Sequence, residues 1–266
     1  MSEAALDAVV ARVGALRAGY EPPGFAHVPD PDAAIFLCAV DHRSGYERAH
    51  RLGDRGPFSG SELLWEVALA GAATRPRLLT APNLAAITAG EVAQLFRIED
   101  ETVAGPERRA ALWRDLAGGL NDAYGGRAAD LLGSASRRLG GAGGLFERLS
   151  RFDAYADPLA KKSQLFAKIC ERRGWFEVGD PARWEVSADN VLMRLALRSG
   201  LVEPGPLAVV RPATRAAFKR VAELAGVTPP LLDDMLWELG RDDPDLLGSP
   251  AGDLREPPRD PDSDWY

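Results

Sequence analysis

Residues 157–200 have the sequence DPLAKKSQLFAKICERRGWFEVGDPARWEVSADNVLMRLALRSG, which predicts two amphipathic helices joined by a loop. The first helix is expected over 158–173 with Asp157 as its N-cap, and the second over 188–199 with Ser187 as its N-cap. Apolar residues recur at helical spacing along most of the chain, and the alternation typical of strands is scarce. We therefore predict an all-α fold.

The same spacing defines the rest of the predicted organisation. Residues 33–42 (AAIFLCAVDH) form a short apolar run that fits either a helix or a strand. Residues 1–240 are expected to form one helical domain, or two lobes of about 1–150 and 151–240, followed by an irregular acidic tail over 241–266. Further helices are predicted over residues 2–17, 59–73, 88–96, 106–124, 127–138, 144–150, 214–225 and 230–240.

Composition excludes several classes of protein. Of the 266 residues, 46% are apolar and 27% are charged, as in ordinary globular proteins, and no apolar run approaches the length of a membrane span. Cys38 and Cys170 both lie in apolar contexts, which favours buried thiols of a cytoplasmic protein over a disulfide framework. With only two cysteines and three histidines, no metal site or cofactor is expected.

The net charge of −7 is distributed unevenly. The tail over 241–266 has eight acidic residues and three arginines, so it contributes −5 and leaves −2 for the other 240 residues. Residues 158–175 carry five basic side chains and one acidic one. A nearly neutral body with one basic patch fits a small anionic ligand better than duplex DNA, which is usually bound by a broad basic face.

Charged residues at the two predicted helix starts are candidates for chemistry. Lys161 and Lys162 lie at the end of a helix where the dipole favours anions, so they are either solvated or hold an anion. Asp189 is either a dipole partner or capping aid, worth ~0.3–1 kcal/mol, or a carboxylate that faces a cationic transition state. The second role is the one required for cleaving a glycosidic bond.

Six segments suggest a family. IFLCAVDH, GPFSGSELLWEVALAG, DAYGGRAADLL, LAKKSQLFAKI, SADNVLMRLALRSGLV and LLDDMLWELG follow one another between residues 35 and 240. Their order and spacing resemble those of the queuosine salvage proteins, which are queuosine 5′-phosphate N-glycosylases. These proteins are similar in fold to helix-hairpin-helix DNA glycosylases of the archaeal 8-oxoguanine type. The resemblance implies a helical glycosylase-like fold with a cleft between lobes.

The resemblance also implies site residues. LAKKSQ is similar to the family's Lys-Arg-Ala-Gln segment, which makes Lys161 the pocket lysine. SADNVL is similar to its Ala-Asp-Tyr-Arg segment, which makes Asp189 the catalytic aspartate. The apolar run that ends in Asp41 places that residue in the pocket, and the late Asp-Tyr-x-Leu-Trp helix adds Asp233 and Trp237.

Two segments depart from the family pattern. An aromatic-rich stretch is replaced by residues 42–48, in which His42 is a candidate binding residue and Tyr46 is the one aromatic side chain. The family's Pro-Gln becomes Met193-Arg194, and Arg194 would either bind a phosphate or pair with Asp189. The base that is released therefore stays open.

The expected function is that of a hydrolase, an N-glycosylase that releases the free base from a modified nucleoside or nucleotide of the queuosine 5′-phosphate type. Asp189 and Lys161 would be catalytic, without a cofactor. Two alternatives are a base-excision DNA glycosylase/lyase, in which a neutral Lys161 attacks C1′, and a non-catalytic nucleotide-binding protein on the same scaffold. A small nucleotide or nucleoside is the expected partner in preference to a nucleic acid, and no membrane partner is expected.

Overall fold

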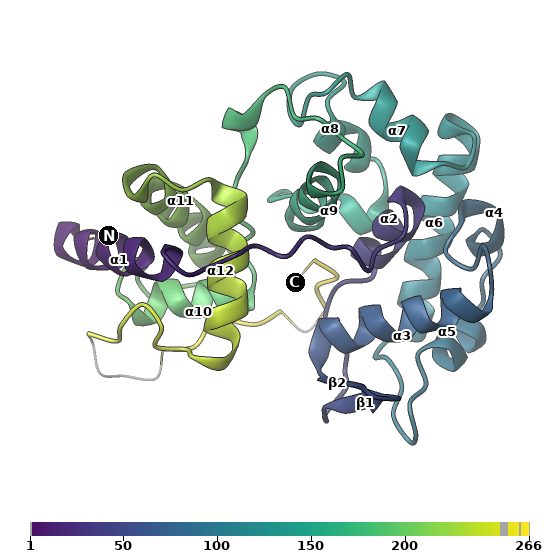
Figure 1. Ribbon diagram of the computed structural model, residues 1–266, viewed down its shortest axis with the longest axis horizontal. Helices are drawn as coiled ribbons and strands as arrows, with labels where there is room; N and C mark the ends of the chain where they lie inside the picture. Colours follow the sequence, from purple (N-terminus) through teal and green to yellow (C-terminus); the bar gives the residue numbers. More distant parts are fainter. Residues whose placement is uncertain (1, 251–254, 261, 266) are drawn as a thin grey trace. The chain divides into compact units, whose positions relative to one another are not determined.

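The computed structural model describes residues 2–250, 255–260 and 262–265, and within these ranges it is mainly helical (Figure 1). Twelve α-helices make up 54% of the described structure, and a single hairpin supplies the 3% that is strand. The all-α prediction is confirmed. No described helix is long and apolar enough to cross a membrane.

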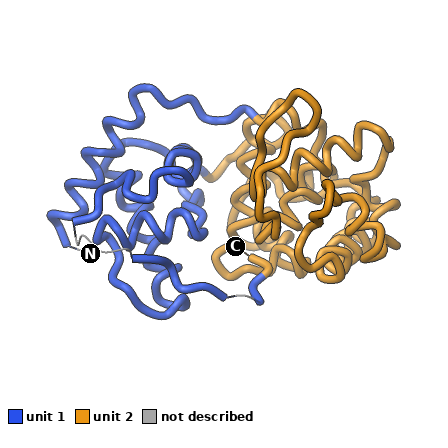
Figure 2. Tube along the Cα trace, turned by 90° about the horizontal axis from the view of Figure 1, so that it is seen from below, with its two compact units in different colours: residues 1–24, 181–263 blue, residues 25–180, 264–266 orange. Residues whose placement is uncertain are grey.

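The chain divides into two compact units (Figure 2). Unit 1 consists of residues 1–24 and 181–263, and unit 2 consists of residues 25–180 and 264–266. The boundaries lie after Gly24 and after Asp180, so the N-terminal helix belongs with the late helices of the chain. A cut near residue 150 would instead have separated α9 from α2, against which it packs.

Unit 1 is a small helical bundle. Helix α1 packs against α11, and α10 packs against both α11 and α12. Gly240 permits the close approach of α12 to α10, because a Cβ atom there would lie 2.6 Å from Cδ1 of Leu195. The elements of unit 1 are α1 (Glu3–Arg17), the short 3-10 helix η2 (Pro181–Arg183), α10 (Asn190–Arg198), α11 (Leu207–Ala225) and α12 (Pro229–Asp242).

Unit 2 is built around α2 (Pro31–Ala39), whose residues from Ala33 to Ala39 are all buried. An apolar run with no polar face requires cover on every side, and α6, α7 and α9 pack against this helix. Residues 33–39 of the apolar run at 33–42 are therefore helical and do not form a strand. The other helices of unit 2 are α3 (Gly60–Thr74), α4 (Ala81–Leu84), α5 (Ala89–Leu95), α6 (Pro106–Tyr124), α7 (Ala128–Ser134), α8 (Leu145–Leu149), η1 (Asp153–Tyr155) and α9 (Lys161–Arg172).

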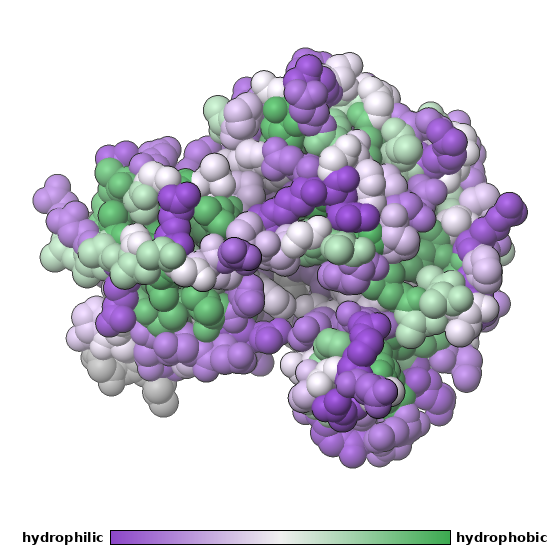
Figure 3. Space-filling model, viewed as in Figure 1, coloured by the Kyte–Doolittle hydropathy of each residue, from purple (hydrophilic) through white to green (hydrophobic). Residues whose placement is uncertain are grey.

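The only sheet among the described residues is an antiparallel hairpin in unit 2, formed by β1 (His50–Leu52) and β2 (Arg55–Phe58). Hydrophilic side chains cover it (Figure 3), as its exposed Arg51 and Arg55 require. The hairpin has no recognisable strand pattern in the sequence, because both strands are very short and the second contains Pro57.

Three helix starts differ from the prediction. Helix α9 begins at Lys161, and Asp157 still contributes, since its carboxylate accepts hydrogen bonds from the amides of Leu159 and Lys161. Helix α10 is capped by Asp189 and not by Ser187. Helix α11 begins at Leu207 and continues through Pro212, which was expected to precede it. In α5, by contrast, the predicted capping box is confirmed, with both of its hydrogen bonds present.

Candidate functional site

A buried ion pair joins the end of α2 to the first turn of α9. The ammonium of Lys161 lies 2.7 Å from Oδ2 of Asp41 and 3.2 Å from the backbone carbonyl oxygen of the same residue. The two side chains are 11% and 8% exposed, so solvent screens the pair weakly. The indole N–H of Trp65 donates to the other carboxylate oxygen of Asp41 at 3.3 Å. Two predicted site residues, 120 positions apart, are thus in direct contact.

The second lysine of the predicted pair, Lys162, is completely buried. Its ammonium donates to the carbonyl oxygen of Ala39 at 2.6 Å and lies 3.2 Å from Nδ1 of His42. Burial, followed by the charge of Lys161, lowers the pKa of Lys162 to about 7. Burial and the cations around it also lower the pKa of His42, so that its ring is neutral at physiological pH. Lys162 is therefore able to exchange a proton near neutral pH.

Arg109 of α6 fixes the loop that carries these groups. Its guanidinium, 2% exposed, donates to the carbonyl oxygens of His42, Arg43 and Ala104. Burial lowers the pKa of Arg109 to about 10, which still leaves it charged at neutral pH. Because one planar guanidinium group binds three backbone carbonyls, the backbone around His42 has a defined conformation.

Tyr46 follows in the same loop but is engaged elsewhere. Its hydroxyl donates to the carbonyl oxygen of Phe96 at 2.7 Å, and its ring packs edge-on against His50 at a centroid distance of 6.4 Å. Desolvation raises the pKa of Tyr46 to about 12. Tyr46 therefore ties the loop to the end of α5.

In unit 1, Asp189 is the N-cap of α10. Its Oδ1 accepts a hydrogen bond from the amide of Leu192 at 3.0 Å, and the residue is 9% exposed. The carbonyl oxygen of the preceding Ala188 accepts a hydrogen bond from Nε of Arg211 at 3.0 Å. This geometry gives Asp189 the capping role that the sequence offered as one of its two interpretations.

The other predicted residues of unit 1 also make structural contacts. Arg194 donates to the carbonyl oxygen of Gly240 at 3.1 Å. Asp233 is buried and accepts the amide of Ser187 at 2.8 Å, which joins α12 to the segment before α10. Trp237 is partly buried, and the guanidinium of Arg241 lies 5.2 Å from the centroid of its ring. Asp233 thus binds the first residue of the short segment 187–189, and Asp189 is its last residue.

The candidate residues fall into two groups. Unit 2 brings together Asp41, His42 and Lys161, and unit 1 contains Asp189, Arg194, Asp233 and Trp237. No sequence pattern assigns a role to Trp65 or Arg109, or a role to Lys162 apart from that of the lysine pair. The signal for Lys162 is its position four residues before Phe166, on the apolar stripe of α9.

Two surface depressions in unit 2 lie away from these groups, so neither supplies a substrate pocket for them. One is lined by residues of α3 to α5, including Arg75, Asn83 and Glu91, and the other by residues of α6, including Arg114, Asp115 and Asp122. Among the described residues, no three His, Cys, Asp or Glu side chains are arranged to hold a metal ion. Both Cys38 and Cys170 are buried free thiols.

The chain matches no protein-family model, and no curated protein sequence matches it.

Proposed function

We propose that the protein is an N-glycosylase that hydrolyses the N-glycosidic bond of a modified nucleoside or nucleotide, with queuosine 5′-phosphate as the model substrate. One observation carries the proposal. Asp41 and Lys161, which the family resemblance independently assigns to the pocket, are 120 positions apart and form a buried ion pair. A buried pair of this kind is costly to maintain for stability alone, which favours a functional role.

The chemistry would proceed by dissociation of the bond between C1′ and the base. The base leaves with the electron pair and takes up a proton, and water adds its oxygen to C1′ and releases a proton. The carboxylate of Asp189 would stabilise the cationic sugar in the transition state. Lys161, oriented by Asp41, would hold the ribose or its phosphate, or donate a hydrogen bond to the departing base.

The binding residues would be those that both the resemblance and the departures from it indicate. The resemblance supplies Asp41, Asp233 and Trp237, and the departures from it supply His42, Tyr46 and Arg194. The hydroxyl of Tyr46 is hydrogen-bonded to Phe96, so its ring would supply the contact with the base.

The test is base release followed by mass spectrometry. The protein is incubated with queuosine 5′-phosphate, with queuosine and with a duplex that contains 8-oxoguanine. Release of queuine from the nucleotide supports the proposal, release of 8-oxoguanine supports the DNA glycosylase alternative, and binding of the nucleotide without release supports the non-catalytic alternative.

Asp189→Asn separates catalysis from capping. Asn caps a helix about as well as Asp, so this variant should fold, whereas an essential carboxylate predicts a loss of at least ~100-fold in turnover. Asp30→Asn is the matched control, because Asp30 caps α2 in the same way, with its Oδ1 2.8 Å from the amide of Ala33. Full activity of Asp189→Asn would contradict the catalytic role.

The lyase alternative has one observation in its favour. Schiff-base chemistry requires a neutral amine, and the lysine with a pKa lowered to about 7 is Lys162. Trapping with borohydride on an abasic or 8-oxoguanine duplex, followed by peptide mapping, identifies the lysine. An adduct at Lys161 or Lys162 supports the lyase, and its absence together with base release supports the hydrolase.

A further inference from the structure

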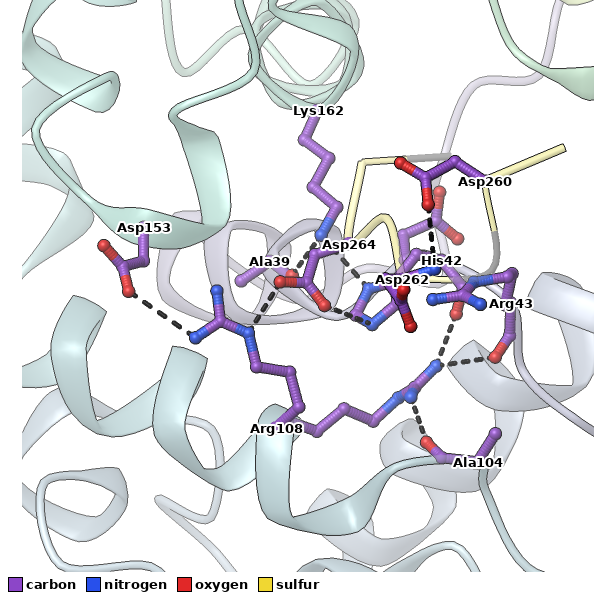
Figure 4. A network of polar contacts seen from close by, with 12 residues as sticks. Ala39, His42, Arg43, Ala104, Arg108, Asp153, Lys162, Asp260, Asp262 and Asp264 are labelled. Atoms are coloured by element: carbon purple, nitrogen blue, oxygen red, sulfur yellow. Dashed lines mark hydrogen bonds and ion pairs between the residues drawn. The ribbon is translucent and has the colours of Figure 1, made fainter. Parts of the chain in front are cut away.

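The C-terminal segment places a carboxylate among the cations of unit 2. Asp264, 15% exposed in its side chain, lies with Oδ2 2.6 Å from Nε of Arg108 and with Oδ1 3.7 Å from Nε2 of His42 (Figure 4). On the far side of the His42 ring, Nδ1 lies 3.2 Å from the ammonium of Lys162. Asp264 thus lies between Arg108 and His42, and Lys162 lies behind the His42 ring.

Positive charge is in excess at this place. Lys162, Arg109 and Lys161 all lie close enough to His42 to lower its pKa through their charges, and Asp41 is the carboxylate bonded to Lys161. Asp41 and Asp264 both act against the lowering of the Lys162 pKa, which shows that each is close enough to offset its charge. The second negative charge of the cluster therefore comes from the tail.

We infer that Asp264 occupies a binding site for a phosphate group, formed by Arg108 and His42 with Lys162 behind them, and that the C-terminal segment competes with the ligand for this site. The inference does not depend on the proposed N-glycosylase activity.

Three properties of the site suit a phosphate. Arg108 presents a planar guanidinium, which binds oxyanions through paired N–H groups, and it is 47% exposed, so a ligand can reach it from solvent. His42 has a neutral ring, and with Nδ1 facing the Lys162 ammonium its Nε2–H points toward the anion. A phosphate monoester carries about −1.5 to −2 charges, which neutralise the cluster better than a single carboxylate.

The geometry also favours a replaceable occupant. The His42 to Asp264 separation of 3.7 Å is longer than a hydrogen bond, so Asp264 is held closely by Arg108 alone of these groups. Arg108 is also paired with Asp153, at 3.6 Å, and would keep that partner when Asp264 leaves. The arrangement resembles an anion-binding site in which Asp264 takes the place of the anion, more than a buried, fully bonded salt bridge.

The experiment measures the affinity of the full chain for inorganic phosphate by calorimetry. We expect Asp264→Asn to bind phosphate about tenfold more tightly than the wild type, which corresponds to a tail that is docked about nine-tenths of the time. Glu256→Gln is the matched control: it removes one negative charge from the same tail, but Glu256 is paired with Arg198 in unit 1. Its phosphate affinity should stay within about twofold of the wild type.

A second variant tests the location. Arg108→Met in the Asp264→Asn background should abolish the gain in affinity. The inference is wrong if phosphate binds no more tightly to Asp264→Asn than to wild type, or if Arg108→Met leaves the gain in phosphate affinity intact. Asp264 would then serve only as a structural ion-pair partner of Arg108. Should Asp264→Asn fail to fold, phosphate titration of the wild type decides by NMR: displacement of the tail must shift the indole resonance of Trp265, and an unchanged resonance overturns the inference.

Discussion

The ammonium of Lys162 and Nδ1 of His42 lie 3.2 Å apart in the interior of unit 2, in side chains that are almost entirely excluded from solvent. Because a protonated amine can only donate, Nδ1 accepts, and the ring carries its proton on Nε2. One contact therefore sets the tautomer of His42 and the direction of its N–H. Burial, followed by the charge of Lys161, makes Lys162 a base with a pKa of about 7.

The first prediction concerns the stability of Lys162→Met as a function of pH. The folded protein has a Lys162 pKa of about 7, lowered from 10.5, so the unfolded chain binds the additional proton between these values. The wild type should then gain stability as the pH rises through this window. The free-energy cost of burying the protonated Lys162 should be fully present below pH 7. The stability of Lys162→Met relative to wild type should fall by about 3–4 kcal/mol between pH 6.5 and 10.

Urea unfolding across this pH range measures the effect. Lys219→Met is the matched control, since Lys219 is a partly exposed lysine paired with Glu185 at 2.5 Å. Its stability relative to wild type should change far less. A Lys162→Met difference that stays constant with pH would show that Lys162 is not a buried base.

The second prediction is that Asp41 and Lys161 are strongly coupled. Removal of one partner leaves the other charge buried, so Lys161→Met and Asp41→Asn should each destabilise the fold by about 3 kcal/mol. The double variant should cost less than the sum, with a coupling of at least ~1.5 kcal/mol. The same cycle on the partly exposed Lys219–Glu185 pair should give less than ~1 kcal/mol. Equal coupling energies in the two cycles would contradict the expectation that burial strengthens the interaction between Asp41 and Lys161.

The third prediction separates the cap from the charge at Asp189. Asp189→Asn should change the free energy of unfolding by less than ~0.5 kcal/mol, and Asp189→Ala should lower it by about 1 kcal/mol, because Ala cannot accept the Leu192 amide. Asp30→Asn and Asp30→Ala should change the free energy of unfolding by similar amounts to the corresponding Asp189 variants. If Asp189→Asn is as unstable as Asp189→Ala, the negative charge has a structural role beyond the cap.

The fourth prediction is that Arg109→Lys destabilises unit 2 by about 2–4 kcal/mol. The guanidinium donates to three backbone carbonyls, and a single ammonium cannot reach all of them. Arg114→Lys is the control on the same helix, since Arg114 is exposed and donates to the carbonyl oxygen of Ile87 at 2.6 Å. Its cost should stay below ~1 kcal/mol. Similar losses in the free energy of unfolding for the two variants would contradict the proposal that Arg109 holds the loop around His42 in place.

The amino-acid sequence by itself determined the helical class and most of the helices. Periodicity defined α1 and α6, the Thr88 capping box defined the start of α5, and Gly125 ended α6, because these signals act within a few residues of the chain. The start of α10 was placed two residues early, since Ser187 and Asp189 are both good caps and only packing selects between them. Likewise, Pro212 did not stop α11, whose buried face is held by α1 and α10.

Tertiary structure alone decided what the charged residues do. No local pattern indicates that Lys161 meets Asp41, that Lys162 loses its solvent, or that Asp264 reaches Arg108 across 156 positions of the chain. The contacts of Lys161 and Lys162 depend on the burial of α2 and on the docking of α9 beside it, which bring distant segments together and remove the water that would otherwise screen their charges.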